Sequence, residues 1–317
     1  MNEYLRPFHE CPGCNSPNSK SNHLFNAIIL GETCPVLKCI NCGLVYKKFA
    51  PTAKGMAKIY SEYYVHFLTD SSQITEADIN SAKQKLDRCR KLLGRNNLLD
   101  NLKLLDIGCG SGNFVKIAQG FNYLAEGIDP YLPPQLENTY LHKKCPEDIP
   151  NSSYDIAVLL NVAEHIDQPI MLFSAVRQLL KPGGVMLLTC PYGNSLARQI
   201  HQACWGHLAL DEHLLFWTPA SLTSLLRQLG FHGKVSYRIA GSPFPYGRVK
   251  PQTTVSTCTE TQHQPFLDSK NQKQSLQTQV WQLARFIQRQ EKTANLVRSL
   301  VHFTHTGDYL EYAINVG

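Results

Sequence analysis

Residues 104–114, with the sequence LLDIGCGSGNF, combine an apolar run, an acid and three glycines within five positions. The short, mostly apolar run 102–107 is typical of a strand that is buried on both faces of a parallel sheet. A helical stretch follows the glycines. A strand that enters a helix through a glycine turn presents backbone N–H groups and a helix N-terminus to a polar ligand. The sequence therefore predicts a ligand site at the end of a buried strand.

The spacing of the glycines leaves two kinds of ligand open. A dinucleotide site favours G-x-G-x-x-G, whose third glycine comes one residue later than Gly112 does here. The acid Asp106 before a G-x-G-x-G turn suits a nucleoside ligand without a pyrophosphate. Downstream, Asp129 follows a presumed second strand, where a carboxylate can accept hydrogen bonds from both ribose hydroxyls. Asp148 precedes the strand-like run 153–160, where it can accept a hydrogen bond from an adenine amino group.

Further motifs occur in an order and spacing that resemble one known family. With the glycine turn, they resemble the class I S-adenosylmethionine-dependent methyltransferases over about residues 100–240, through GIDP (127–130), EDIP (147–150), NVAEHI (161–166), LLKPGGVMLLTCP (179–191) and HLLFWTPASLTSLLRQLGF (213–231). The resemblance implies an α/β fold, with a Rossmann-like seven-stranded methyltransferase sheet, helices on both faces and a small zinc ribbon before it. The segment IYSEYY (59–64) is similar to a subgroup of small-molecule methyltransferases with that N-terminal module.

The resemblance also implies roles for the matching positions. In this interpretation the glycine turn holds the methionine part of S-adenosylmethionine, one acid orients the turn or the amine, and later residues hold the ribose, the adenine and the floor of the site. The residues are Gly108, Cys109, Gly110 and Gly112 with Asp106; Asp129 for the ribose; Asp148 and the Ile149 backbone for the adenine; Asn161 and Val162 for the floor; and Tyr63 or Tyr64 as a cover. Asp148 as a helix cap and the tyrosines as core aromatics are the structural alternatives.

Two C-x-x-C knuckles occur near the N-terminus: Cys11 with Cys14, and Cys39 with Cys42. Two thiolates on each turn complete the tetrahedral four-sulfur site that zinc favours. Because this region has little core of its own, the metal would supply folding energy. Cys34 lies outside the pattern. We predict a closed, structural Zn²⁺ site; two unrelated redox or surface pairs are the alternative.

Methyl transfer from a sulfonium is an in-line displacement, so positioning of the acceptor is decisive. An acceptor hydroxyl or ammonium also needs a general base, and histidine is the natural one near neutral pH. His165 follows the fourth strand, with Glu164 placed to orient it, and His213 lies beside an aromatic cluster. His165 and His213 are the catalytic candidates. As alternatives, His165 can cap the helix and bind backbone, and the nearby His207 can be a surface residue. Some ubiquinone-pathway O-methyltransferases carry a metal-binding acid where this chain has Asn161, which disfavours a catalytic metal.

Composition restricts the class of protein. The chain has 317 residues, 43% apolar and 18% charged, with a net charge of +6, which is typical of a globular protein. Its basic points, such as Lys47-Lys48 and 88–91, are short and are interpreted as solvated surface. Eleven cysteines, an odd number, favour reduced thiols over a disulfide framework. The N-terminus lacks a secretory pattern and no apolar run has the length of a membrane helix, so we expect a cytoplasmic protein without a membrane partner.

The order of segments predicts a zinc ribbon in 1–50, a helical linker or cap in 51–100 and a methyltransferase domain in 101–317. We expect a sixth strand near 231–240 and a closing, antiparallel strand at 307–317. Residues 242–300 are then an insertion, rich in Pro, Thr and Gln at first and helical in pattern from about 274. Insertion and linker are candidates for a lid that shapes the substrate site, with a dimer contact or simple packing as alternatives. The oligomeric state stays open.

Three functions compete. The leading one is methyl transfer from S-adenosylmethionine to a small-molecule oxygen, carbon or nitrogen, with oxygen preferred because histidine bases are available. A zinc-ribbon RNA methyltransferase is the second, but the fourth strand ends in NVAEH and not in Asn/Asp-Pro-Pro-aromatic, and the ribbon lacks a basic, aromatic face, so nucleic acid is disfavoured. The third is a non-catalytic binding module, against which the intact glycine turn and its acids argue.

Overall fold

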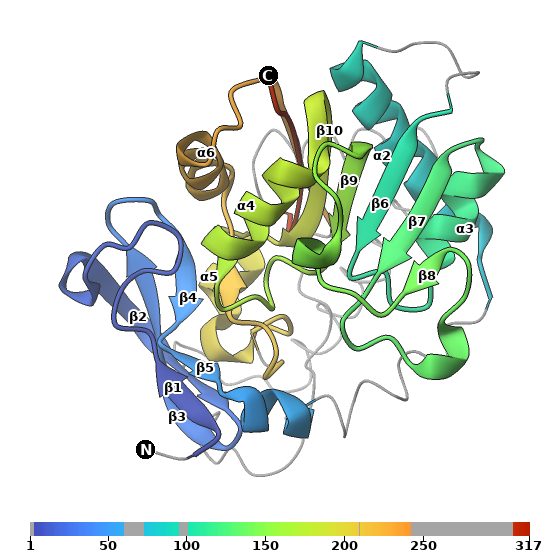
Figure 1. Cartoon of the computed structure of the whole chain (residues 1–317). Coiled ribbons are helices and arrows are strands. Elements are labelled where there is room, and N and C mark those ends of the chain that lie inside the picture. Colours follow the sequence, from blue (N-terminus) through green and yellow to red (C-terminus); the bar gives the residue numbers. More distant parts are fainter. Residues whose placement is uncertain (1–2, 60–72, 95–100, 209, 242–306) are drawn as a thin grey trace, which may run out of the picture.

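The computed structural model describes residues 3–59, 73–94, 101–208, 210–241 and 307–317 (Figure 1). Its main element is a seven-stranded sheet in the order β12-β13-β10-β9-β6-β7-β8. The strands are β6 (Lys103–Ile107), β7 (Leu124–Ile128), β8 (Leu141–His142), β9 (Tyr154–Leu160), β10 (Leu180–Pro191), β12 (Val235–Ala240) and β13 (Tyr309–Asn315). β13 runs antiparallel to β10 and β12, and the pairs from β8 to β10 are parallel. The predicted fold class and the antiparallel closing strand are confirmed.

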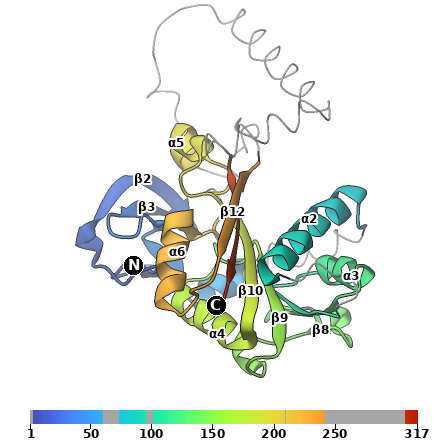
Figure 2. The ribbon, with the colours of Figure 1, turned by 90° about the horizontal axis from the view of Figure 1, so that it is seen from above.

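Helices cover both faces of this sheet (Figure 2). Successive strand residues point to opposite faces, so Leu104 packs with α2 and α3 and Leu105 packs with α4 and α6. The helices are α2 (Glu76–Leu93), α3 (Asn113–Gly120), α4 (Pro169–Leu179), α5 (Leu196–His201) and α6 (Pro219–Gln228). Burial on both faces explains why 104–107 is apolar apart from Asp106. Among the described helices, none has the length and apolar character of a membrane-spanning segment.

Local sequence explains where these helices begin and end. Thr75 caps α2 through a capping box with Asp78, and Gly94 ends it with φ 68°. Thr218 caps α6 in the same way, with Pro219 as its first residue. Helix α3 begins directly at Gly112. The sheet order reverses at β6, which lies between β7 and β9, and ligands of such sheets bind outside the carboxyl ends of the strands at this reversal.

The N-terminal region forms a two-stranded and a four-stranded sheet from β1 (Leu5–Pro7), β2 (Ser21–Ile29), β3 (Glu32–Cys39), β4 (Val45–Lys47) and β5 (Phe49–Pro51). The four-stranded sheet has the order β11-β4-β3-β2, and its edge strand β11 (Leu215–Phe216) comes from the chain between β10 and β12. The ribbon therefore shares a sheet with the segment that leads into α6. The division of the chain into three units stays a prediction.

Two basic points are not solvated surface. Lys47 is fully buried, and its ammonium donates to the Leu210 carbonyl at 2.7 Å. Burial lowers its pKa to about 8. On α2, the buried Arg90 donates to the Tyr123 hydroxyl at 2.7 Å. Sequence proximity of like charges suggested exposure, whereas distant partners take these cations into the interior. The predicted insertion at 242–300, and Tyr63 with Tyr64, lie outside the described residues.

Candidate functional site

The glycine turn after β6 depends on backbone conformations that side chains disfavour. Gly108, Gly110 and Gly112 have φ of 74°, 51° and 74°. A Cβ on Gly108 would lie 2.5 Å from Val162 Cγ2, and one on Gly112 would lie 2.5 Å from Leu141 Cδ1. The N–H groups of Gly108 and Cys109 donate to the Ile128 carbonyl at 2.8 and 3.1 Å. The turn is thus fixed against β7 and β9 and brings bare backbone to the sheet's carboxyl edge.

Asp106 is a buried acid at the end of β6. It is 2% exposed, and its Oδ1 has no hydrogen-bond partner among the described residues. Burial, with the nearby Asp129, raises its pKa to about 8. The acid is therefore mostly protonated at neutral pH, and a cation bound beside it would favour the ionised form. The ammonium and sulfonium of S-adenosylmethionine are such cations, so the chemistry of this position fits that ligand.

Asp129 lies just after β7 and is 3% exposed. Its Oδ2 accepts the Gly110 N–H at 3.2 Å, and its Oδ1 accepts the Tyr131 N–H at 2.8 Å. Each carboxylate oxygen can accept a second hydrogen bond. Asp129 therefore braces the glycine turn with a group of the type that accepts from hydroxyl groups. The ribose role stays a prediction.

The adenine candidates have a structural task as well. Asp148 is exposed, and its Oδ2 accepts the Cys145 N–H at 2.9 Å in a capping box at the 3₁₀ turn Pro146–Asp148. This is the capping role considered as the alternative. Ile149, partly buried, packs on the core. A binding role for the two residues remains a prediction.

The floor candidates lie at the end of β9. Asn161 is exposed and has φ 58°, a conformation that is uncommon for a residue with a side chain. Its N–H donates to the Thr189 carbonyl at 3.0 Å, and its Oδ1 accepts from Thr189 Oγ1 at 3.3 Å. Val162 fills the space that the missing Cβ of Gly108 leaves. Val162 thus lies beside the glycine turn, and the floor role of the two residues stays a prediction.

The two catalytic candidates and Glu164 form one group. The His165 and His213 rings meet edge to face with centroids 4.8 Å apart, and ligand atoms of all three residues lie within 4.8 Å of one another. Glu164 is fully buried, and neither carboxylate oxygen has a hydrogen-bond partner among the described residues. Its Oε1 is 4.0 Å from His165 Nε2, too far for the orienting hydrogen bond that the sequence suggested.

Burial sets the protonation of this group. It raises the pKa of Glu164 to about 8, lowers that of His165 to about 4 and lowers that of His213 well below its usual value. Both imidazoles are therefore neutral at neutral pH. His213 Nδ1 is 2.8 Å from the His207 carbonyl, so this nitrogen carries the proton and Nε2 carries the lone pair. Chemically, the group can accept a proton or hold a divalent cation through two nitrogens and a carboxylate.

Long-range contacts bring His213 to His165. The N–H groups of Leu214 and Leu215 donate to the Glu164 carbonyl at 2.8 and 3.1 Å. Trp217 Nε1 donates to the Ala163 carbonyl at 2.9 Å. On its other side, the Lys47 N–H donates to the Leu214 carbonyl at 2.9 Å. The ribbon strand β4 and the end of β9 thus hold the His213 segment between them.

The four knuckle cysteines come together as predicted. Cys11 Sγ is 3.6 Å from Cys42 Sγ, and Cys14 Sγ is 3.6 Å from Cys39 Sγ, with all four within 4.8 Å. A tetrahedral zinc with Zn–S bonds of about 2.3 Å places its sulfurs about 3.8 Å apart, so the thiols fit Zn²⁺. The Cys11 thiol, donating to Cys42, lowers the pKa of Cys42 to about 5. Cys34 lies outside this cluster, and all described cysteines are free thiols.

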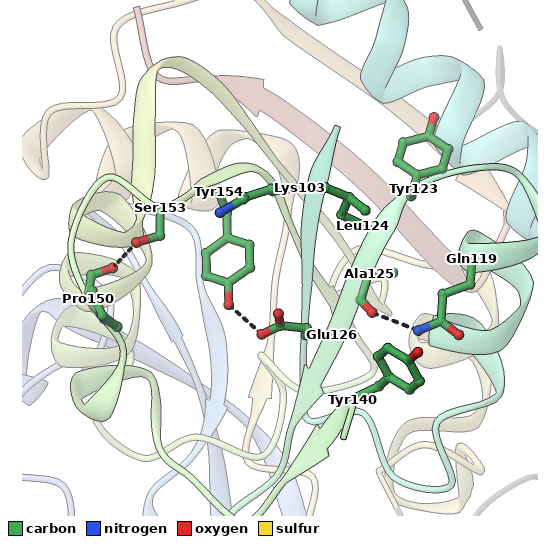
Figure 3. A pocket seen from close by; sticks show the side chains of 10 residues that line it. All are labelled: Lys103, Gln119, Tyr123, Leu124, Ala125, Glu126, Tyr140, Pro150, Ser153 and Tyr154. Carbon is green, nitrogen blue, oxygen red and sulfur yellow. Dashed lines mark hydrogen bonds between the residues drawn. The ribbon is translucent and has the colours of Figure 1, made fainter. Parts of the chain in front are cut away.

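A separate pocket of about 570 Å³ lies at the amino ends of the strands (Figure 3). Its lining includes Lys103, Leu124 and Tyr154, the first residues of β6, β7 and β9. In it, the Tyr154 hydroxyl donates to Glu126 at 3.0 Å. Because ligands of parallel sheets bind at the carboxyl ends, we do not assign this pocket to the nucleoside.

Sequence reasoning missed two features of the site. It did not find that β11 completes the ribbon sheet, because a two-residue strand has no readable period. It also passed over Arg198 on α5, which is 7% exposed. The signal for Arg198 was weak: one basic residue in the segment 192–202 after the strand β10.

Comparison with known proteins gives a consistent family. A family described as "Methyltransferase domain" matches residues 77–234. A "Ubiquinone biosynthesis O-methyltransferase" of Rickettsia canadensis is 27% identical over 140 residues, 41% of this chain and 57% of the relative. The protein of the same name from Dinoroseobacter shibae is 30% identical over 152 residues, 42% of this chain and 61% of the relative. The chain thus spans roughly three fifths of these relatives' length.

Among solved structures, a SAM-dependent methyltransferase from Archaeoglobus fulgidus aligns with 80% of this chain and 99% of its own, at 15% identity and a TM-score of 0.48.

Proposed function

Residues 77–234 of this chain are a methyltransferase domain, and from this premise we propose that the protein transfers a methyl group from S-adenosylmethionine to a small-molecule acceptor, with oxygen as the preferred atom. One observation carries the proposal: the glycine turn, the unpaired Asp106 carboxylate and the pair of neutral histidines occur together at the carboxyl edge of the sheet. The similar proteins from Rickettsia canadensis and Dinoroseobacter shibae are named as O-methyltransferases of ubiquinone biosynthesis, which supports oxygen as the methylated atom.

The residues divide the work of holding the nucleoside. Gly108, Gly110 and Gly112 offer backbone N–H groups, and Asp106 would offer a negative charge to the methionine end once a bound cation favours its ionised form. Asp129 offers acceptors to the ribose, and Asp148 with Ile149 lies where the adenine is expected. S-adenosylmethionine, when bound, supplies an electrophilic methyl group. The protein's contribution is to hold the acceptor in line with it and to exclude water.

His213 is the residue that we propose to accept the acceptor's proton. Its Nδ1–H is held by the His207 carbonyl, so its Nε2 lone pair has a fixed direction. His165 lies against it and limits the movement of the ring. A neutral imidazole of fixed tautomer is ready to take a proton without first losing one.

Replacement of His213 by alanine should lower kcat by about a hundredfold or more, the usual contribution of a general base. His165→Ala should cost about tenfold, because its role is to pack the base. The assay is release of S-adenosylhomocysteine at saturating cofactor with a panel of hydroxylated small molecules. If neither change lowers turnover more than a few-fold, the base lies elsewhere or the reaction needs none.

The pH profile provides a second test of this base. A histidine whose pKa is lowered by burial is already deprotonated at pH 6, so wild-type kcat should be flat between about pH 6 and 7, below the raised pKa of about 8 of the neighbouring Glu164. An exposed histidine would instead give a rising limb near its ordinary pKa of about 6.5. Such a limb, retained in His213→Ala, would contradict the assignment.

Metal analysis separates the base from a metal-ligand role for the same group. With zinc only in the cysteine site, purified protein should contain one ion per chain, and His213→Ala should keep it. A second equivalent that disappears in His213→Ala would show that Glu164, His165 and His213 hold a cation.

RNA methylation is the second candidate function. The burial of Lys47, a basic residue of the ribbon, argues against it. Lys47 is buried and occupied by the Leu210 carbonyl, which removes one cation from any RNA-facing surface. We expect no shift of labelled RNA at physiological salt. A shift with the steep salt dependence of phosphate contacts would favour the RNA reading. Absence of saturable S-adenosylmethionine binding in calorimetry would instead support a non-catalytic module.

A further inference from the structure

Arg198 differs from the other arginines of the described chain, because it has no acceptor. Its Nε is buried without a hydrogen-bond partner, and no carboxylate of the described residues forms an ion pair with it. The side chain of each of the others has at least one acceptor: Arg6 has Asp167, Arg88 and Arg238 have Glu311, Arg90 has the Tyr123 hydroxyl, Arg177 has the Gly230 carbonyl, and Arg227 has the Phe231 and Gly233 carbonyls. Single nitrogens of Arg88, Arg90 and Arg238 are also buried without a hydrogen-bond partner, but these guanidinium groups are held through other atoms or an ion pair.

The Arg198 guanidinium is mostly buried, but part of it remains accessible to solvent. Arg198 is 7% exposed, so more than nine tenths of the residue is removed from solvent. Its Nε belongs to the buried, unpartnered atoms, whereas its two terminal nitrogens do not and keep access to solvent. Burial lowers the pKa of Arg198, and no carboxylate opposes this effect. An unpaired buried cation is costly for the folded state, and this cost is recovered when an anion binds.

Further cationic or donor groups surround the same helix. His201, one turn along α5, also has a buried Nε2 without a partner among the described residues. Residues three positions apart lie on one face of a helix. Before the helix, Lys38 Nζ from β3 lies 3.4 Å from Asn194 Oδ1. Two separate elements therefore bring positive or donor groups to this place.

The position of α5 suggests how Arg198 and His201 could contact the methyl acceptor. The helix follows β10 after residues 192–195, at the edge where β9 ends at Leu160, and Figure 2 shows it beyond that end of the sheet. The chain continues from α5 through Trp205 to His207, whose carbonyl orients His213. The open guanidinium and the proposed base thus belong to one short segment, 196–213.

We propose that Arg198, assisted by His201, binds an anionic group of the methyl acceptor, so that the acceptor is a phosphorylated or carboxylated small molecule. The planar guanidinium matches two oxygens of either group. That the anion belongs to the methyl acceptor rests on the proposed function; that an anion binds here does not.

The test uses the full-length protein and two probes, inorganic phosphate and succinate, each compared with chloride at equal ionic strength. We expect one of them, at about 50 mM, to raise the wild-type Tm by about 2 °C or more, because ligands of the folded state stabilise it. Arg198→Met should lose this shift and, without anion, melt at or above the wild-type Tm. His201→Asn should reduce the shift. Arg177→Met, which removes an arginine bound to a backbone carbonyl on α4, is the matched control and should keep it.

The outcomes are distinct. A shift with phosphate alone identifies a phosphorylated acceptor, and one with succinate alone identifies a carboxylated acceptor, provided that Arg198→Met abolishes it. No shift beyond chloride in wild type, or an equal shift in Arg198→Met, overturns the proposal. Arg198→Lys keeps the charge and should keep part of the shift, which covers the case in which the methionine variant does not fold. Calorimetry of S-adenosylmethionine on the same samples judges the proposed function separately, since Arg198→Met should bind it within about twofold of wild type.

Discussion

Asp129→Ala should weaken S-adenosylmethionine binding by about a hundredfold. The carboxylate braces the glycine turn through the Gly110 N–H and is the predicted acceptor for the ribose hydroxyls. Hydrogen bonds to a charged group contribute about 1.5–3 kcal/mol each, and about 1.4 kcal/mol corresponds to a factor of ten. Isothermal titration calorimetry measures the loss directly.

Two further variants serve as controls for this experiment. Asp129→Asn keeps one acceptor oxygen but brings an NH₂ group against a backbone donor, so it should recover little of the affinity. Asp148→Ala removes an exposed carboxylate that caps a 3₁₀ turn and should cost about tenfold or less. Zinc content should be unchanged in all three proteins. Wild-type affinity in Asp129→Ala would remove the ribose assignment.

Cys11→Ser should abolish most of the turnover while leaving S-adenosylmethionine binding within a few-fold of wild type. A missing thiolate weakens the zinc site, whose binding free energy is also folding free energy for so small a module. Loss of the ribbon releases β11 from β4, and with it the Lys47 contact to Leu214 that supports His213. The glycine turn has its own supports on β7 and β9.

Cys34→Ala is the matched control for this prediction. Cys34 is buried in the same ribbon but lies outside the four-thiol cluster, so its loss should keep one zinc per chain. Metal content, turnover and calorimetric affinity are measured on each protein. If Cys11→Ser lost zinc but kept full turnover, the ribbon would not position the base. If it lost cofactor affinity in parallel with turnover, the ribbon would support the whole domain and not one segment.

These two predictions separate the parts of the site. Asp129 is proposed to act on the nucleoside at the reversal point of the sheet, whereas Cys11 is proposed to act through the ribbon on the segment 207–217. Closed four-thiolate shells leave no open position for chemistry, so an effect of Cys11 on turnover has to be mechanical. The structural route for it is the pair of strands β4 and β11.

The sequence by itself determined the features that depend on neighbouring residues. The glycine turn was readable because positive φ, close packing and a helix start within five residues all demand glycine there. The four cysteines were readable because each knuckle sets two sulfurs by local geometry alone. The seven-stranded sheet, with its antiparallel closing strand, was expected from the resemblance to class I methyltransferases. The glycine turn and the cysteine knuckles depend on residues that are close together in the sequence, so a short motif is enough to predict them.

Only the tertiary structure decided which distant groups meet and which charges are buried. It showed Lys47 in the interior, the ribbon sheet completed by β11, Glu164 without a hydrogen bond to His165, and Arg198 without a partner. Each depends on residues far apart in the chain. Residue type predicts exposure for most lysines and arginines, but the packing of distant segments decides which of them are buried. The proposed base and anion site therefore depend on the fold, whereas the nucleoside and zinc sites follow from sequence motifs.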